Sequence, residues 1–132
     1  MFDRPESERE KHFRRVHMPN YVLLLHDSGT MPPDMSPADI QAVIQRYVAW
    51  RQRVERDGRK VIGHKLTDGD GRVMRGKVGA ATIIDGPYAE AREVIGGLFV
   101  LEANNYDEVV QLCQDCPHLE FGTIEVRQVQ PT

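Results

Sequence analysis

An aspartate at the end of a predicted strand is the first residue whose type and position could carry chemistry. Asp85 closes an extended stretch and directly precedes Gly86-Pro87. There its carboxylate can accept hydrogen bonds from the following backbone amides and hold a turn. In a partly buried cleft the same group would be a stronger base, suited to general acid–base work. Both roles are open from the sequence, and Asp85 is our first catalytic candidate.

His26 is the candidate proton partner of this carboxylate. It ends the apolar run that starts at Tyr21, where a histidine is either a hydrogen-bonded edge residue or a catalyst. An Asp85–His26 pair would suit acid–base chemistry on an aromatic or carbonyl compound. Further side chains could line the same cleft, or be simply solvated: His64 on the next strand, Tyr88 as a wall or lid, and the charged residues Glu90, Arg92 and Glu93.

Two sequence patterns are typical of metal sites but lack essential parts. Cys113 and Cys116 form a C-x-x-C, yet they lie at the C-terminal end of a predicted helix, where the helix dipole disfavours a thiolate. His118 is near, but no second ligand pair stands at metal spacing elsewhere. Residues 68–71 (DGDG) lack the third acid and the closing glutamate of a calcium loop and predict a turn. We therefore expect no metal and no cofactor, and we interpret Cys113 as a core residue.

The elements that must position these residues follow an α+β order. Ser36 followed by Pro37 predicts a helix start, and Gly58 predicts the stop of that helix. A second helix begins after Asn104-Asn105 and ends before Pro117. The number of strands between residues 61 and 85 is left open. The predicted extended segments cover residues 21–26, 61–66, 73–84, 97–103 and 121–129.

This order predicts a ferredoxin-like βαββαβ core, with both helices on one face of an antiparallel sheet. The first strand is central in that topology, and its alternate residues are apolar on both faces. A second sheet from a partner chain is the simplest cover for the face without helices. We therefore predict a homodimer of the dimeric α+β barrel type, with a cleft at the interface that could hold a small-molecule ligand.

Composition narrows the class of protein. The 132 residues suit one domain, which we place at residues 20–130 after a charged extension over residues 1–19. The net charge is -3 and basic residues are interspersed with acidic ones, so nucleic acid is not an expected partner. No apolar run approaches the length of a membrane span, and residues 1–15 lack the apolar core of a secretory signal. We expect no membrane partner and a cytoplasmic protein.

A longer motif carries a family resemblance. Residues 85–102, DGPYAEAREVIGGLFVLE, resemble the signature of YCII-related proteins of the DGPF type. In that family Asp-Gly-Pro-Phe is followed by Ala-Glu, a basic–acidic pair, Gly-Gly and a strand. The likeness extends to residues 122–127 and covers about the last half of the chain, whereas the first half agrees in pattern only. The resemblance implies a dimeric ferredoxin-like fold.

The resemblance implies less about activity. Stand-alone YCII proteins pair a histidine near the start of the first helix with an aspartate in an Asp-Pro step after the second. The corresponding places here are held by Asp39 or its neighbours and by Cys116-Pro117, so the dehydrochlorinase-like activity of one branch is not implied. DGPF-type members often accompany extracytoplasmic-function sigma factors. The sequence thus leaves two functions: a small-molecule-binding or enzyme-like protein, or a regulatory binding module that acts with such a sigma factor without catalysis.

Overall fold

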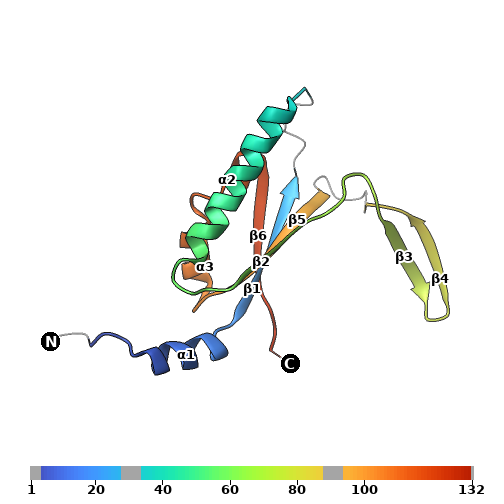
Figure 1. Cartoon of the computed structure of the whole chain (residues 1–132). Coiled ribbons are helices and arrows are strands. Elements are labelled where there is room, and N and C mark those ends of the chain that lie inside the picture. Colours follow the sequence, from blue (N-terminus) through green and yellow to red (C-terminus); the bar gives the residue numbers. More distant parts are fainter. Residues whose placement is uncertain (1–3, 28–33, 88–93, 132) are drawn as a thin grey trace.

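The main sheet of the protein has four antiparallel strands with helices on one face. The computed structural model describes residues 4–27, 34–87 and 94–131, without the side chains of residues 14–17. The strand order is β2-β5-β1-β6, and Figure 1 shows α2 and α3 on the same side of the sheet. This is the predicted ferredoxin-like α+β fold. The elements are α1 (Glu8–His17), β1 (Asn20–Asp27), α2 (Pro37–Glu55), β2 (Val61–Lys65), β3 (Arg72–Lys77), β4 (Ala80–Asp85), β5 (Val94–Glu102), α3 (Tyr106–Cys113), the 3-10 helix η1 (Pro117–Glu120) and β6 (Gly122–Gln128).

Local capping explains where the two packed helices begin. The Ser36 hydroxyl accepts a hydrogen bond from the Asp39 amide at 3.1 Å, and the Asp39 carboxylate accepts from the Ser36 amide at 3.2 Å. This capping box satisfies amides that lack partners at a helix start. In α3, Asn105 caps the Glu108 amide at 2.8 Å. The predicted start of each helix is confirmed.

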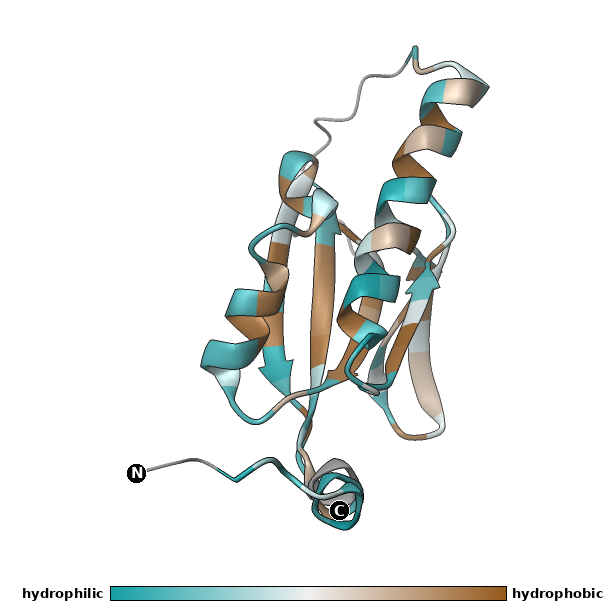
Figure 2. Ribbon diagram, turned by 60° about the vertical axis from the view of Figure 1, so that its left-hand side comes forward, coloured by the Kyte–Doolittle hydropathy of each residue, from teal (hydrophilic) through white to brown (hydrophobic). Residues whose placement is uncertain are grey.

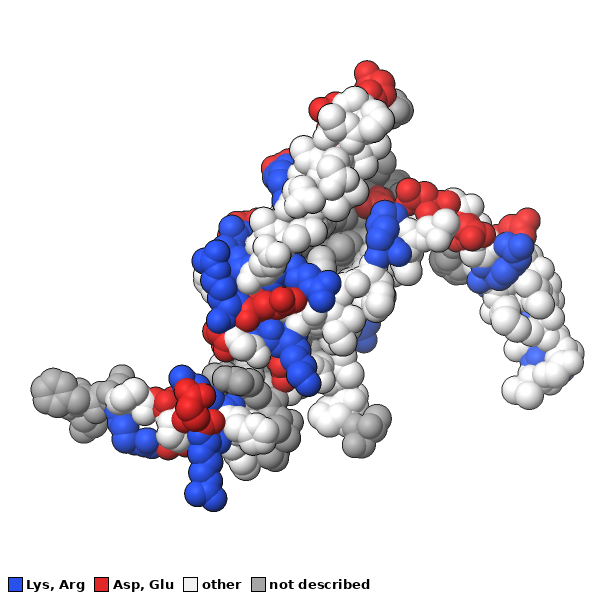
Figure 3. All heavy atoms as spheres, viewed as in Figure 1, with Lys and Arg blue, Asp and Glu red and all other residues white. Residues whose placement is uncertain are grey.

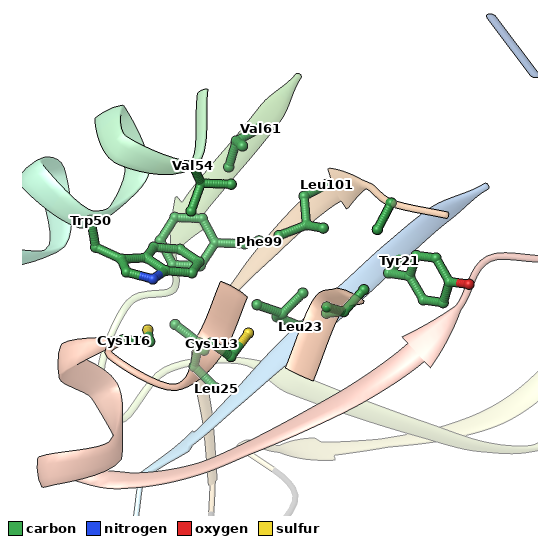
Figure 4. Close-up of a cluster of buried hydrophobic side chains, with 12 residues drawn as sticks. Tyr21, Leu23, Leu25, Trp50, Val54, Val61, Phe99, Leu101, Cys113 and Cys116 are labelled. Carbon is green, nitrogen blue, oxygen red and sulfur yellow. The ribbon is translucent and has the colours of Figure 1, made fainter. Parts of the chain in front are cut away.

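The core lies between the helices and one face of the sheet. Trp50 of α2 donates from Nε1 to the Leu112 carbonyl at 3.0 Å, and its ring centroid lies 5.2 Å from that of Phe99 on β5. A side chain at Gly63 would collide with the Phe99 ring, so the glycine on β2 leaves the room that this ring occupies. Figure 4 shows the cluster, whose other buried members are Tyr21, Leu23, Leu25, Val54, Val61, Leu101, Ala103, Val109, Cys113 and Cys116.

The opposite face of the sheet carries apolar side chains without a helix over them. On β1, Val22 and Leu24 alternate with the core residues and are half-buried. Val22 is paired with Val100 and Leu24 with Leu98 on β5, so these four side chains share the helix-free face. Figure 2 shows that the central strands are hydrophobic along much of their length. We call this surface, with Ile62 of β2 beside Val100, the open face.

Residues 61–85, whose strand number the sequence left open, form three strands in two separate sheets. β2 joins the main sheet at its edge, whereas, among the strands that the structure describes, β3 and β4 pair only with each other. Gly79, with a φ of 80°, lies in the tight turn between them. At the other end, the Gly86 amide donates to the Gly71 carbonyl at 2.9 Å, so the first and last residues of the hairpin lie side by side where it joins the rest of the fold. Figure 1 shows the β3–β4 hairpin projecting from the side of the sheet opposite the helices.

The N-terminal segment contains a helix that the sequence did not predict. α1 spans Glu8–His17, within the residues for which we expected a solvated or partly ordered extension. Its apolar periodicity is weak, but the Ser7 hydroxyl accepts from the Glu10 amide at 3.1 Å, and Lys11 bonds Glu8 at 3.2 Å. Figure 1 shows α1 apart from the helix layer on the sheet. Within the described ranges, no helix has the length and apolar character needed to cross a bilayer.

Candidate functional site

A histidine–glutamate pair lies on the open face at the end of β1. His26 Nε2 is 2.9 Å from Glu125 Oε1, and the two side chains are 21% and 43% exposed. Glu125 on β6 is directly opposite Leu24, and His26 is opposite Thr123, so the pair is a diagonal cross-strand contact. The pair therefore places two polar groups beside the apolar rows of the open face.

Glu125 determines which nitrogen of His26 is available for chemistry. An ionised carboxylate only accepts hydrogen bonds, so Nε2 carries the proton and donates it to Glu125. In the neutral ring the lone pair then lies on Nδ1. A carboxylate that fixes the tautomer and orientation of a histidine is the arrangement that general acid–base catalysis uses. The pair can thus accept a proton from a bound molecule, or hydrogen-bond to it.

A β-bulge lies next to this histidine. The register of β1 with β5 shifts between Leu25 and His26, because Gly97 faces Leu25 while Ile95 faces His26. Gly96 is the extra residue, and a side chain there would collide with the Asp27 carboxylate. Bulges re-aim side chains at sheet ends and are common next to functional sites.

A second, buried histidine hydrogen-bonds to the backbone at the same end of β1. His118 of η1 is 3% exposed, and its Nε2 lies 3.0 Å from the His26 carbonyl oxygen. Since a carbonyl only accepts, Nε2 of His118 carries a proton, and in a neutral ring Nδ1 accepts from the Tyr47 hydroxyl 3.0 Å away. Burial raises the pKa of Tyr47 to about 12, which keeps this hydroxyl protonated as a donor. Tyr47, His118 and the backbone of His26 form one continuous hydrogen-bonded chain.

Removing the hydroxyl at one end of this chain should have a measurable but limited cost. We expect Tyr47→Phe to lower the free energy of unfolding by about 1 kcal/mol, because His118 Nδ1 loses its part-buried partner. Urea denaturation would measure the change. Tyr106→Phe is the matched control: its hydroxyl accepts from the Gln128 amide at 2.8 Å in an exposed position, so its loss should cost less. Equal costs for the two variants would contradict the special role of Tyr47.

The sequence-predicted site residues fall into three groups. His26 and His64 share the open face, with His64 exposed on β2 opposite Leu98. Asp85 ends β4 at the base of the hairpin, where its carboxylate is 91% exposed and 3.5 Å from Arg72 Nη1. A role for Asp85 in a cleft between two chains stays a prediction. The other candidates, Tyr88, Glu90, Arg92 and Glu93, lie outside the described residues.

Two residues of this site were not singled out from the sequence. Glu125 belongs to the polar alternation of the last strand with Thr123 and Arg127, and β6 neighbours β1 in the predicted topology. That combination could have paired Glu125 with His26. His118 was considered only as a neighbour of the two cysteines, and no sequence signal indicates that both of its nitrogens are occupied by hydrogen bonds.

The two cysteines lie in the core as free thiols. Burial raises the pKa of Cys113 to about 12 and also raises that of Cys116. The interpretation of Cys113 as a core residue is confirmed. In the part of the chain that the structure describes, no three histidine, cysteine or acidic side chains are grouped as a metal site would need.

These thiols should be unreactive in the folded protein. We expect no labelling by a thiol reagent at pH 8 until the chain is unfolded, when both should react. The pKa of Cys113 also predicts a loss of stability in alkali. The folded thiol keeps its proton up to about pH 12, whereas an unfolded thiol ionises near pH 8.5. Between these two pH values the unfolded chain therefore binds fewer protons than the folded chain. The free energy of unfolding should therefore fall as pH rises above about 8.5. In the labelling experiment, rapid reaction of the native protein would contradict the burial of the two thiols.

Comparisons with known proteins match the chain to a family and to distantly similar solved structures. The sequence model of the YCII-related domain matches residues 20–132. No curated protein matches the chain. Among solved structures, the solution structure of a hypothetical Arabidopsis thaliana protein shares 15% sequence identity over 87% of this chain and 88% of that chain, with a TM-score of 0.40.

Proposed function

This chain belongs to the YCII-related domain family, and from that premise we propose that it is a homodimer that binds, and acts as an acid–base enzyme on, a small molecule at its open face. The observation that carries this proposal is the His26–Glu125 pair at 2.9 Å beside apolar rows on that face. A site of this kind combines an apolar wall with a few polar groups that fix orientation, as small-molecule sites generally do.

The apolar character of the open face supports the proposed dimer. Val22, Leu24, Leu98 and Val100 form adjacent pairs on the two central strands. A monomer would leave this patch in water, whereas two copies related by a two-fold axis would cover each other's patch with the same residues. Stacked sheets pack about 10 Å apart, so side chains from both open faces would interdigitate and enclose the ends of the strands.

Enclosure would strengthen the chemistry of the pair. Removing water from His26 and Glu125 lowers the local dielectric and makes each hydrogen bond to a bound molecule stronger. The imidazole would then exchange a proton with an aromatic or carbonyl compound, and Leu24 and Leu98 would contact its apolar part. His64 is a further contact on the same face, and Asp85 is a second acid–base candidate if the dimer brings the hairpin base to this cleft.

The alternative is a regulatory module that binds a sigma factor without chemistry. Such a surface needs complementary shape, but it does not need a histidine held in one tautomer by a carboxylate. The geometry of the pair therefore favours the small-molecule function.

A ligand screen on matched variants tests the proposal. Aromatic and carbonyl compounds would be screened by thermal shift, and their affinities measured by calorimetry for the wild type, His26→Ala and Glu125→Gln. We expect at least a tenfold loss of affinity in both variants, because His26→Ala removes the ring that contacts the ligand and Glu125→Gln removes the negative charge that orients that ring. Asp107→Asn, an exposed carboxylate on α3, is the control and should bind as the wild type. Ligands that bind all variants equally, or binding of a sigma factor alone, would contradict the proposal.

A further inference from the structure

We propose that the β3–β4 hairpin is an intersubunit arm that packs on the first half of α2 of a second copy of this chain. The inference rests on the proposed homodimer, and it adds a second contact between the two copies. It starts from two apolar surfaces that the single chain leaves in water.

The hairpin is the first of these surfaces. It forms a sheet of its own, and every residue of its two strands except Val73 is exposed. A two-stranded hairpin is marginally stable in water at best and needs a surface to pack on. Large apolar side chains are nevertheless concentrated in it: the exposed ones are Met74, Val78, Ile83 and Ile84.

One face of the hairpin is suited to packing. Met74 is opposite Ile83, and Gly76 is opposite Ala81, so these four residues share one face of the hairpin, which ends at its base in the Arg72–Asp85 ion pair. The other face carries Arg75, opposite Thr82, and Lys77, together with the apolar pair Val73 and Ile84. We call the Met74–Ile83 side the apolar face of the arm.

The first half of α2 is the second surface. Ile40, Ile44 and Val48 recur every four residues and are 40–47% exposed, although their helix is packed on the sheet further along. This spacing places the three side chains on one stripe of the helix. Between Pro37 and Ala49 the charged residues are Asp39 and Arg46, and Arg46 is paired with Glu120 at 2.9 Å. Figure 3 shows this part of α2 as a largely uncharged surface.

The two surfaces lie on opposite sides of the sheet of one chain. Figure 1 shows α2 on one side and the hairpin on the other, and Figure 3 shows open space between the hairpin and the sheet. A second copy stacked on the open face would occupy that space with its own sheet. The helix layer of that copy would be its outer layer, on the side toward which the hairpin projects. Contact between the arm and α2 is therefore possible between copies and not within one.

The charges of the hairpin and of α2 also favour a contact between two copies of this chain. β3 and β4 contain three cationic residues, Arg72, Arg75 and Lys77, against the single carboxylate of Asp85. The N-terminal end of α2 has two carboxylates, Asp34 and Asp39. The strands of the arm therefore carry a net positive charge and this end of the helix a net negative charge, so the two attract each other, although Arg75 and Lys77 lie on the face turned away from α2 and Arg72 is paired with Asp85. A two-fold axis would form this contact twice in each dimer.

Charge insertion on matched positions tests the arm. The dimer dissociation constant would be measured by analytical ultracentrifugation for Ile83→Asp and for Ile44→Asp. We expect at least a tenfold increase in each, because each places a carboxylate in an apolar contact. The controls add the same charge next door, Thr82→Asp on the other face of β4 and Gln45→Asp on α2, and they should dimerise as the wild type. The double variant Ile83→Asp/Ile44→Asp should have a dissociation constant no higher than that of the more affected single variant, because both substitutions remove the same contact.

Excision of the arm gives an independent measurement. Because Gly71 and Gly86 are joined by a hydrogen bond of 2.9 Å, residues 72–85 can be removed and replaced by two glycines without moving β2 or β5. The core of this variant should stay folded. Its dimer dissociation constant should rise as much as that of Ile83→Asp. Unchanged dimerisation of the excised or Ile83→Asp protein would overturn the arm, and multiplying effects in the double variant would overturn its contact with α2. If Leu24→Asp abolishes the dimer in the same assay while the arm variants do not, the open-face dimer stands and the arm alone fails.

Discussion

Leu24→Asp is expected to convert the proposed dimer into a folded monomer. Leu24 lies on the central strand β1, between Leu98 on β5 and Glu125 on β6, so it occupies the middle of the open face. An aspartate there would be buried in the interface without a cation to pair with, at a cost of several kcal/mol per copy. Two copies would each contribute one such charge. Light scattering at micromolar concentration should therefore give half the mass of the wild type.

A control and a contrary outcome make this result decisive. Val110→Asp adds the same charge at an exposed apolar residue of α3, on the helix side of the sheet, and should leave the mass unchanged. Leu24 is half-buried in the single chain, so the variant should retain the circular dichroism of a folded protein. A wild type that is already monomeric, or a Leu24→Asp variant that still dimerises, would show that the open face is not the interface.

His118→Leu should be the most destabilising change at the site. The leucine fills similar space, but the Tyr47 hydroxyl and the His26 carbonyl each lose a part-buried hydrogen-bond partner. An unsatisfied buried polar group costs about 1–3 kcal/mol, so we expect the free energy of unfolding to fall by about 3 kcal/mol. The loss should exceed that of Tyr47→Phe, which removes one of the two bonds.

The same variant separates anchoring from simple packing. If His118 holds the end of β1, the NMR signals of the His26 ring should shift or broaden in His118→Leu, while those of His64 on the distant edge strand should not. In Tyr47→Phe the bond from His118 to the His26 carbonyl remains, so the His26 signals should stay in place. A loss below 1 kcal/mol with unchanged His26 signals would contradict the anchoring role.

The sequence predicted the elements of the core well because their signals are local. Ser36 with Pro37 and Asn105 are capping residues, and their effect depends on amides three residues away. The two apolar alternations of β1 also indicated, correctly, a central strand with apolar side chains on both faces. Such short-range patterns need no knowledge of the rest of the chain.

Long-range partners were not predictable in the same way. The His26–Glu125 pair joins residues 99 positions apart, and a diagonal contact requires the register of β6 on β1. The position of β3 and β4 was also unclear, because a free hairpin and two strands of the main sheet have the same alternation of residues. The apolar periodicity of α1 is weak, with Phe13 and Val16 among mostly charged residues, so the pattern of residues 8–17 gave little reason to expect a helix.

The position of Trp50 in the core has a consequence for the fluorescence of the protein. It is the single tryptophan of the chain, it is buried, and its indole faces Phe99 and the Leu112 carbonyl on the helix side of the sheet. Its fluorescence should therefore change when the core unfolds and stay constant when two copies separate at the open face. Comparing its emission with molecular mass along a dilution series would distinguish dissociation from unfolding in a single sample.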